Sequence, residues 1–228
     1  MYLYETHVHT APVSRCATAS VADTVRFYKE IGYAGLFITN HFLDGNIRID
    51  RSLPYDERIR FYFSDYEEAL RVGRAIGIDV FCGVEMSDRG TDFLVYGLNK
   101  EWFLWHPEIE GMKKSELLPL LSAEGALIVQ AHPFREASYI DHIRLFPRHV
   151  HAVETYNACR SSFENAMADQ YAQSYDLLPF AGSDNHAGPS LRRLGGMQAV
   201  TPVKDEADFV RRVKCGEIIP FRRDLDEE

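Results

Sequence analysis

The stretch YLYETHVHT, residues 2–10, has the pattern of a short buried strand and ends in two histidines. Because side chains alternate between the two faces of a strand, His7 and His9 point to the same side. Two imidazoles on one face at the end of a strand suit one metal ion. Histidines that only form hydrogen bonds can have the same spacing, so the pair taken alone leaves both interpretations open.

Short apolar runs of this kind alternate with amphipathic, capped segments along the chain, which is typical of βα units and a parallel sheet. We expect strands at residues 2–6, 35–39, 78–84, 92–96, 126–130, 152–156 and 178–182. Helix signals separate the strands; Ser20 and Asp23, for example, form a capping box ahead of an apolar stripe that Gly32 terminates. The sequence has no internal repeat and no Ser/Gly linker. Seven parallel strands in one domain, residues 1–228, favour an α/β barrel.

The composition is that of an ordinary folded protein. The 228 residues are 46% hydrophobic and 26% charged, which excludes disorder as the main state. Lys and Arg number 25 and Asp and Glu 34, so the formal charge is −9, and we do not expect a nucleic-acid duplex as a partner. No apolar run approaches the ~20 residues of a bilayer span, so we expect no membrane segment. The four cysteines are widely separated and no secretory signal precedes them, which leads us to expect a cytoplasmic protein.

Nearly every other expected strand also ends in a residue able to bind a metal: His41, Glu85, His132, and Asp184 with His186. Active sites of parallel α/β barrels are built at the carboxyl ends of the strands. Histidine nitrogens with a few carboxylate oxygens suit zinc, iron or manganese rather than calcium. His149 and His151 repeat the first spacing, but they precede the strand at 152–156, so we expect them at the opposite end of the barrel.

These residues lie in five motifs in a fixed order. The sequence reads His-Val-His-Thr at 7–10, Thr-Asn-His at 39–41, Gly-Val-Glu at 83–85, Ala-His-Pro at 131–133 and Gly-Ser-Asp-Asn-His at 182–186. The motifs resemble those of the PHP (polymerase and histidinol phosphatase) superfamily of metal-dependent phosphoesterases, and the resemblance spans nearly the whole chain. It implies a single-domain, distorted (β/α)7 TIM-like barrel that holds two or three divalent ions, zinc, manganese or iron.

The resemblance also implies a role for each ligand. The first metal site would use His7, His9, Glu85 and Asp184; Glu85 would bridge to a second metal held by His132; and a third site would use His41 and His186. A bridging carboxylate offsets the repulsion between two cations ~3.5–4 Å apart, and such a pair can activate a water. We therefore expect Glu85, Asp184 and His186 to be catalytic.

The sequence departs from the family pattern at three places. Ser14-Arg15-Cys16 stands where several three-metal members have a histidine, so Cys16 or a water would complete the third site, or Arg15 would bind the substrate phosphate there. Cys16 can equally be a small buried side chain. Asn40 replaces the usual Asp of the second motif and removes a charge that could orient His41. Asp92 takes the place of a further histidine, where it could bind a metal or cap a loop.

Three arginines, Arg15, Arg135 and Arg160, follow strand ends, and guanidinium groups bind phosphate in a bidentate manner. We expect them to bind the substrate, although each could also be a surface residue. Glu154 lies within an apolar strand, where it would face either the barrel interior, beside the ligands, or the surface. The segment 42–63 is rich in Asp, Arg and aromatic residues and is a candidate lid or substrate loop.

The sequence therefore predicts a metal-dependent hydrolase that cleaves a phosphate monoester or a small phosphodiester with a metal-activated water. Its partner would be a small phosphorylated substrate. Two alternatives stay open: an amidohydrolase-type metal hydrolase, whose barrel also begins with His-x-His, and a catalytically silent PHP module that binds metal or a phosphorylated ligand.

Overall fold

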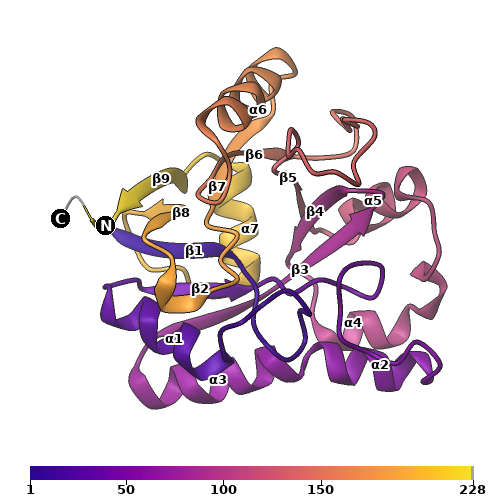
Figure 1. Ribbon diagram of the computed structural model, residues 1–228, viewed down its shortest axis with the longest axis horizontal. Coiled ribbons are helices and arrows are strands. Elements are labelled where there is room, and N and C mark those ends of the chain that lie inside the picture. Colours follow the sequence, from indigo (N-terminus) through magenta and orange to yellow (C-terminus); the bar gives the residue numbers. More distant parts are fainter. Residues whose placement is uncertain (227–228) are drawn as a thin grey trace.

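The computed structural model of the chain describes residues 1–226 (Figure 1). Its strands are β1 (Tyr2–Val8), β2 (Gly35–Ile38), β3 (Asp79–Asp88), β4 (Thr91–Tyr96), β5 (Leu127–Ala131), β6 (Ala152–Asn157), β7 (Leu178–Gly182), β8 (Arg193–Ala199) and β9 (Ile219–Asp224). Its α-helices are α1 (Val21–Glu30), α2 (Tyr55–Tyr62), α3 (Ser64–Ile76), α4 (Lys100–Trp105), α5 (Lys114–Ala123), α6 (Ser162–Ser174) and α7 (Glu206–Lys214). No helix in this part of the chain is long and apolar enough to cross a membrane.

One sheet contains all nine described strands, in the order β7-β6-β5-β4-β3-β2-β1-β8-β9. The sheet curls into a nearly closed barrel because the ends of β1 and β7 meet. Val8 forms a parallel bridge with Asn185, and the backbone N–H of His9 donates to the carbonyl of Asn185 at 2.9 Å. The fold is therefore the distorted TIM-like barrel that the sequence predicts.

All seven expected strands are present, but one runs in the opposite direction. β4 is antiparallel to both β3 and β5, whereas the sequence analysis treated it as parallel. The reason is the connection: only Arg89 and Gly90, both with positive φ, separate β3 from β4, and a turn this short makes a hairpin rather than a crossover. β8 and β9 were not predicted, because RLGGMQA and IPFRRD carry no clear apolar alternation.

Aromatic rings fill one end of the barrel. Phe209 of α7 lies 4.4 Å from the ring of Phe37, 5.6 Å from that of Tyr96 and 6.3 Å from that of Phe180, measured between centroids. These four side chains are fully buried. Because α7 closes this end, the polar residues gather at the other end, where the parallel strands have their carboxyl termini.

The segment 42–63 folds back onto the barrel. It contains α2, and the side chains of Phe42, Ile59 and Tyr62 are buried in one hydrophobic cluster. The hydroxyl of Tyr62 donates to the carbonyl of Asn40, next to an expected ligand. Asp44, Gly45 and Asn46 reach the rim of a cleft described below. The role of this segment as a lid or substrate loop stays a prediction.

The pairing of β1 with β8 depends on a close approach at Gly196. A Cβ atom there would lie 2.3 Å from the carbonyl oxygen of Tyr4, so Gly196→Ala should lower the free energy of unfolding by about 3 kcal/mol. Gly111→Ala is the control, since Gly111 also has positive φ but no atom within 4 Å of its Cβ position; it should cost about 1 kcal/mol. Urea denaturation measures both, and equal losses would contradict the close approach.

Candidate metal centre

The seven residues expected to bind metal lie together at the open end of the barrel. They form three overlapping groups whose ligand atoms lie within 4.8 Å of one another: His7, His9 and Asp184; His7, Glu85 and His132; and His9, His41 and His186. They come from the ends of β1, β2, β5 and β7 and from the middle of the long strand β3. The structure thus brings together residues up to 179 positions apart in the chain, from His7 to His186.

Glu85 occupies the middle of this cluster. Its Oε1 is 3.2 Å from Nε2 of His7, and its Oε2 is 2.6 Å from Nδ1 of His41. Oε1 also lies 3.5 Å from Nε2 of His132. Asp184 faces the same space, with Oδ1 3.4 Å from Nε2 of His9. A carboxylate in contact with histidines of all three groups has the position that a bridging ligand requires.

Unpaired buried atoms indicate that the cluster is suited to hold metal ions. Five of its buried polar atoms have no hydrogen-bond partner among residues 1–226: Nε2 of His7, Nε2 of His9, Nδ1 of His41 and both carboxylate oxygens of Glu85. Buried polar atoms are nearly always paired, because an unpaired one loses its hydration without compensation. Imidazole and carboxylate are also the donors that zinc, iron and manganese accept. The residues therefore fit a centre of divalent ions.

The histidines and carboxylates of the cluster shift one another's pKa values. Burial opposes the ionisation of Glu85 and Asp184, but the neighbouring histidines hold the pKa of both carboxyl groups well below their usual range. Burial and the proximity of His186 and His41 lower the pKa of His9 well below its ordinary value. Ionised carboxylates and a neutral imidazole are the forms that bind a metal. The same carboxylates raise the pKa of His7 and His41, despite their burial, so metal ions would displace protons from these two rings.

Backbone strain marks two of these residues. His132 has φ 26° and Asp184 has φ 56°, in the left-handed region that residues with a Cβ rarely adopt. Such conformations cost about 1–3 kcal/mol each and persist where the surroundings enforce them, often at functional sites. His132 directly follows β5 and Asp184 lies two residues after the end of β7, and both side chains belong to the ligand groups.

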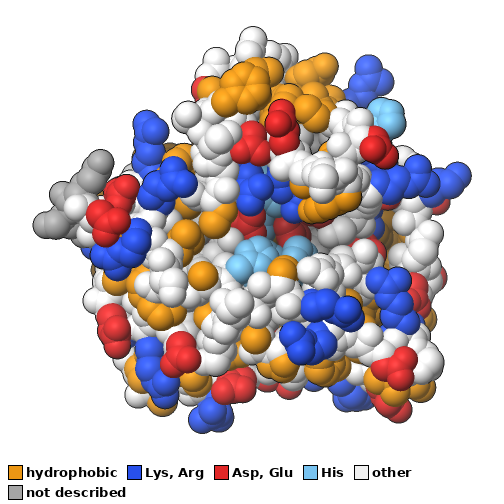
Figure 2. Space-filling view, viewed as in Figure 1, with side chains coloured by type: hydrophobic (Ala, Val, Ile, Leu, Met, Phe, Trp, Pro, Cys, Tyr) orange, Lys and Arg blue, Asp and Glu red, His pale blue; other side chains and the backbone are white. Residues whose placement is uncertain are grey.

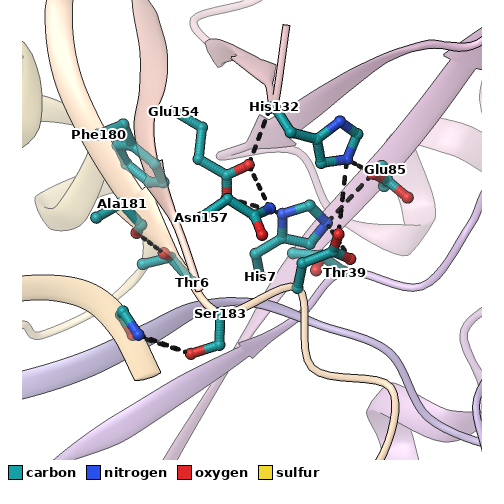
Figure 3. Close-up of polar contacts among 12 residues, drawn as sticks. Thr6, His7, Thr39, Glu85, His132, Glu154, Asn157, Phe180, Ala181 and Ser183 are labelled. Atoms are coloured by element: carbon teal, nitrogen blue, oxygen red, sulfur yellow. Dashed lines mark hydrogen bonds and ion pairs between the residues drawn. The ribbon is translucent and has the colours of Figure 1, made fainter. Parts of the chain in front are cut away.

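Glu154 faces the interior and holds two of these residues (Figure 3). It is fully buried, and its Oε1 accepts from Nδ1 of His7 at 2.9 Å. Its Oε2 accepts from the backbone N–H of His132 at 3.0 Å and from Nδ2 of Asn157 at 2.9 Å. Because Nδ1 of His7 carries the proton, Nε2 is free to bind a metal. The sequence left the orientation of Glu154 open, and the structure turns it inward.

A second hydrogen-bond network holds His9, and in it Asp65 supplies the negative charge that Asn40 lacks. Nδ1 of His9 lies 3.2 Å from the hydroxyl of Ser14, which donates to Oδ1 of Asn40 at 2.8 Å and accepts from the backbone N–H of His41. Nδ2 of Asn40 donates at 3.0 Å to Asp65, a buried carboxylate at the start of α3. Asn40 thus acts on His9 through Ser14 rather than on the ring of His41. Sequence reasoning missed Ser14 and Asp65 as parts of the site.

Five residues of this cluster line a cleft of about 520 Å³: His41, Glu85, His132, Asp184 and His186 (Figure 2). Two of the three predicted arginines line this cleft. Nη2 of Arg135 is 2.9 Å from Oδ2 of Asp92, and Nη2 of Arg160 is 3.7 Å from Oδ2 of Asp184. Arg15 is exposed, does not line the cleft and donates to the carbonyl of Ile47 at 3.5 Å.

Asp92 belongs to the cleft because β4 is antiparallel, which puts the start of this strand at the ligand end. Its Oδ2 is 3.8 Å from Nε2 of His132, and burial together with the charge of Glu85 raises the pKa of its carboxyl group. Arg89, which was not predicted, lines the cleft beside it.

Cys16 also lines the cleft, beside His41 and His186. Burial raises the pKa of its thiol, but the interactions with His186 and His41 prevail and lower it to about 6. His186 is held in turn by its Nδ1, which donates to the carbonyl of Asp184 at 2.9 Å.

Sequence comparison with known proteins gives a partial match. No protein-family model matches the sequence. An uncharacterised protein of Methanocaldococcus jannaschii is 38% identical over 79 residues, a match that covers 31% of this chain and only 33% of that protein.

Solved structures match over nearly the whole chain. A two-domain protein of Bacteroides vulgatus, which contains a predicted PHP-like metal-dependent phosphoesterase, matches with TM-score 0.67 at 13% identity, over 96% of this chain and 64% of that one. A putative metal-dependent phosphoesterase of Bifidobacterium adolescentis matches with TM-score 0.56 at 13% identity, over 99% and 98%. An amidohydrolase of Chromobacterium violaceum, with bound sulfate and no metal, matches with TM-score 0.54 at 12% identity, over 95% and 97%. The chain therefore has the fold of PHP-like metal-dependent phosphoesterases.

Glu154→Gln tests how His7 is held. A glutamine offers one acceptor oxygen to three donors, so His7 or the backbone of His132 loses its partner, and metal affinity should fall about 10–100-fold while the chain stays folded. Competition with a chromophoric chelator measures this affinity. Glu164→Gln is the matched control, because Glu164 caps α6 at the surface. Equal affinities in the two variants would refute the role of Glu154.

Asn40→Asp tests whether Asp65 supplies the negative charge of the network around His9. The variant sets two carboxylates against each other at the 3.0 Å contact with Asp65, so the free energy of unfolding should fall by about 2 kcal/mol. Adding Asp65→Asn restores an amide opposite a carboxylate and should recover part of this loss. If thermal or urea denaturation finds the double variant no more stable than Asn40→Asp alone, repulsion between carboxylates at positions 40 and 65 is not the cause of the loss.

Proposed function

We propose that this chain is a metal-dependent phosphoesterase that hydrolyses a phosphate monoester or a small phosphodiester. The observation that carries the proposal is the set of unpaired, buried donor atoms on His7, His9, His41 and Glu85. His41 and Glu85 line a cleft that Arg135 and Arg160 also line. The fold shared with PHP-like phosphoesterases supports the same reaction class.

The residues have separable tasks in this proposal. His7, His9, Glu85 and Asp184 would hold a first divalent ion, and Glu85 would share a second with His132, close to Asp92. When bound, such ions supply Lewis acidity, which activates a water and neutralises charge on the attacked phosphorus. Glu154 and Ser14 keep the protonated Nδ1 atoms of His7 and His9 turned away from the ions.

Arg135 and Arg160 would bind and orient the substrate. Each is mostly buried at the cleft wall, and each guanidinium already faces a carboxylate of the cluster, Asp92 or Asp184. A guanidinium donates two parallel N–H groups to two phosphate oxygens, and this fixes the orientation of the ester relative to the ligands. We include Arg160 and Arg135 in the site and leave Arg15 out, because Arg15 lies outside the cleft.

The cleft suits a small substrate. Its volume of about 520 Å³ lies within the range of ordinary small-molecule sites. The formal charge of −9 gives no general attraction for a nucleic-acid duplex. We propose a small phosphorylated substrate as the partner and the cytoplasm as the location, the latter on the four widely separated cysteines.

An amidohydrolase-type reaction is the second candidate, since one structural neighbour is an amidohydrolase. The arginines support the phosphoester. A phosphate ester is anionic at the reacting centre itself, where two guanidinium groups can bind it, whereas a scissile amide group is neutral.

Metal removal and a ligand substitution test the proposal. Protein reconstituted with zinc, manganese or iron should contain at least two equivalents of metal and hydrolyse p-nitrophenyl phosphate or bis(p-nitrophenyl) phosphate, and chelation should abolish the activity. Asp184→Asn should reduce the rate at least about 100-fold, because a misplaced ion misplaces the reacting atoms. Asp205→Asn, at the N-cap of α7 on the closed end, is the control and should retain activity.

Three outcomes would overturn the proposal. Hydrolysis of amides but of neither ester would make the chain an amidohydrolase. Two bound metals without hydrolysis of any ester would make it a binding module. Full activity of folded, metal-loaded Asp184→Asn would exclude the assigned site.

A further inference from the structure

We propose that the cavity between α6 and the strands β8 and β9 is a binding site for a small phosphorylated anion, separate from the cleft of the candidate metal centre (Figure 1). Three arginines, Arg160, Arg193 and Arg222, line this cavity of about 480 Å³. The inference goes beyond the proposed hydrolysis and depends on no metal ion. It assigns a ligand to a part of the chain that lies outside the five sequence motifs.

Strand pairing places Arg193 and Arg222 on one face of the sheet. β8 and β9 are antiparallel, with Gly195 opposite Arg222 and Arg193 opposite Asp224. Paired residues lie on the same face of a sheet, and so do residues two positions apart on one strand. The side chains of Arg193 and Arg222 are therefore diagonal neighbours on the face that borders the cavity.

The ring of Tyr156 packs against this face and also lines the cavity. A Cβ atom at Gly195 would lie 2.9 Å from Cδ1 of Tyr156, so the glycine makes room for the ring. The guanidinium carbon of Arg222 lies 6.0 Å from the centre of the same ring, within the range of a cation–π contact. This contact keeps the guanidinium of Arg222 at the cavity.

Two of the three arginines have no anionic partner. Within residues 1–226, the side chains of Arg193 and Arg222 form no hydrogen bond and no ion pair, whereas Nε of the adjacent Arg192 lies 2.9 Å from Oδ1 of Asp226. Asp224 lies opposite Arg193, but its Oδ1 accepts from the backbone N–H of Asp226 at 3.0 Å. The chain has 34 acidic residues against 25 Lys and Arg, so carboxylates are not scarce. The two guanidinium groups are thus available to an external anion.

Arg160 supplies the third guanidinium from the loop between β6 and α6. Its Nε is buried and has no hydrogen-bond partner in the described part of the chain. Ser162, the first residue of α6, lines the cavity as well, and the free N–H groups of a helix N-terminus favour an anion. Asp169 is the one carboxylate among the lining residues that the structure describes, and it accepts from Nε2 of Gln173 at 2.7 Å. Three cations against one carboxylate leave the cavity positive.

The chemistry of these groups selects the ligand. Guanidinium groups bind phosphate oxygens in a bidentate manner, and the cavity has the size of a small-molecule site. Among the described residues, Arg160 alone lines both this cavity and the cleft, so one molecule in both would have to pass its guanidinium. We therefore assign a free phosphorylated anion rather than the far end of a substrate held in the cleft.

Chemical modification of arginine tests the site directly. The full, metal-loaded chain is treated with phenylglyoxal in the presence of increasing inorganic phosphate, and mass spectrometry follows each arginine separately. At about ten times the midpoint concentration of its effect, phosphate should slow the modification of Arg193 and Arg222 about tenfold. Arg192 is the internal control, because it is exposed but does not line the cavity, and it should react at an unchanged rate.

Arg193→Ala and Arg192→Ala are the matched variants. Loss of Arg193 removes charge-assisted hydrogen bonds to phosphate, so the midpoint for the protection of Arg222 should rise about 10-fold or more. Arg192→Ala should leave this midpoint unchanged. Equal midpoints in the two variants would overturn the proposal. A wild-type chain in which phosphate does not slow the modification of Arg222 would overturn it as well.

Kinetics separate this site from the cleft. Arg193→Ala should keep the kcat and KM of the wild type for p-nitrophenyl phosphate, because Arg193 does not line the cleft, whereas Arg135→Ala should raise KM and keep the protection of Arg222. An equal loss of hydrolysis in both variants would place the anion in the substrate cleft and overturn the separate site. A chain that cleaves no ester but shows protection that depends on Arg193 would disprove the proposed function and support the anion site. A chain that cleaves esters without any such protection would disprove the anion site alone.

Discussion

The cluster of candidate metal ligands depends on one buried carboxylate, that of Glu5, which joins β1 to the residue directly after β7. Its Oε1 accepts three backbone N–H groups, from Thr6 and His7 at 2.9 Å and from Ser183 at 3.0 Å. Its Oε2 accepts from the hydroxyls of Tyr28 and Ser183. Without this acceptor, the donors at the seam would be buried and unpaired, a cost of about 1–3 kcal/mol for each group. Because the seam closes here, the two histidines at the end of β1, His7 and His9, lie beside Asp184 and His186, which follow β7.

Around this seam the charges are arranged in two shells. The inner carboxylates, Glu85 and Asp184, face the space that the histidine nitrogens surround. The outer carboxylates, Glu154 and Asp65, hold His7 directly and His9 through Asn40 and Ser14. Buried carboxylates in such number are tolerated only when cations or N–H donors compensate them. The outer carboxylates are compensated by hydrogen bonds, whereas both oxygens of Glu85 have no hydrogen-bond partner within residues 1–226 and would be compensated by divalent ions.

The sequence could predict the strands and the ligands because both follow from local patterns. A strand has period two, and a parallel barrel collects its active residues at strand ends, so the His-x-His at 7–9 and the residue after each apolar run identify the cluster. The same reasoning separates His151, whose Nδ1 accepts from the backbone N–H of Ile128 at the other end of the barrel. The direction of β4 depends on a two-residue turn, and the parts played by Ser14 and Asp65 depend on their contacts with Asn40, across 26 and 25 residues. No local pattern encodes such contacts. Glu154 was recognisable as a buried carboxylate, but its direction depended on which face of β6 meets the barrel interior.

One side of the cleft is built from strand ends and the other from loops, and this difference bears on selectivity for the substrate. The hydrogen bonds of Glu5 and Glu154 hold the ends of β1, β5 and β7, which carry most of the groups that would hold metal. The opposite wall is built from connecting segments, with Cys16, Asp44, Arg89 and Arg135 projecting from loops and turns. Loops accept substitution and insertion more readily than paired strands. A barrel of this design can therefore keep its candidate ion-binding residues constant while the loop wall determines which small molecule fits, and in this chain that wall supplies both the guanidinium of Arg135 and the thiol of Cys16.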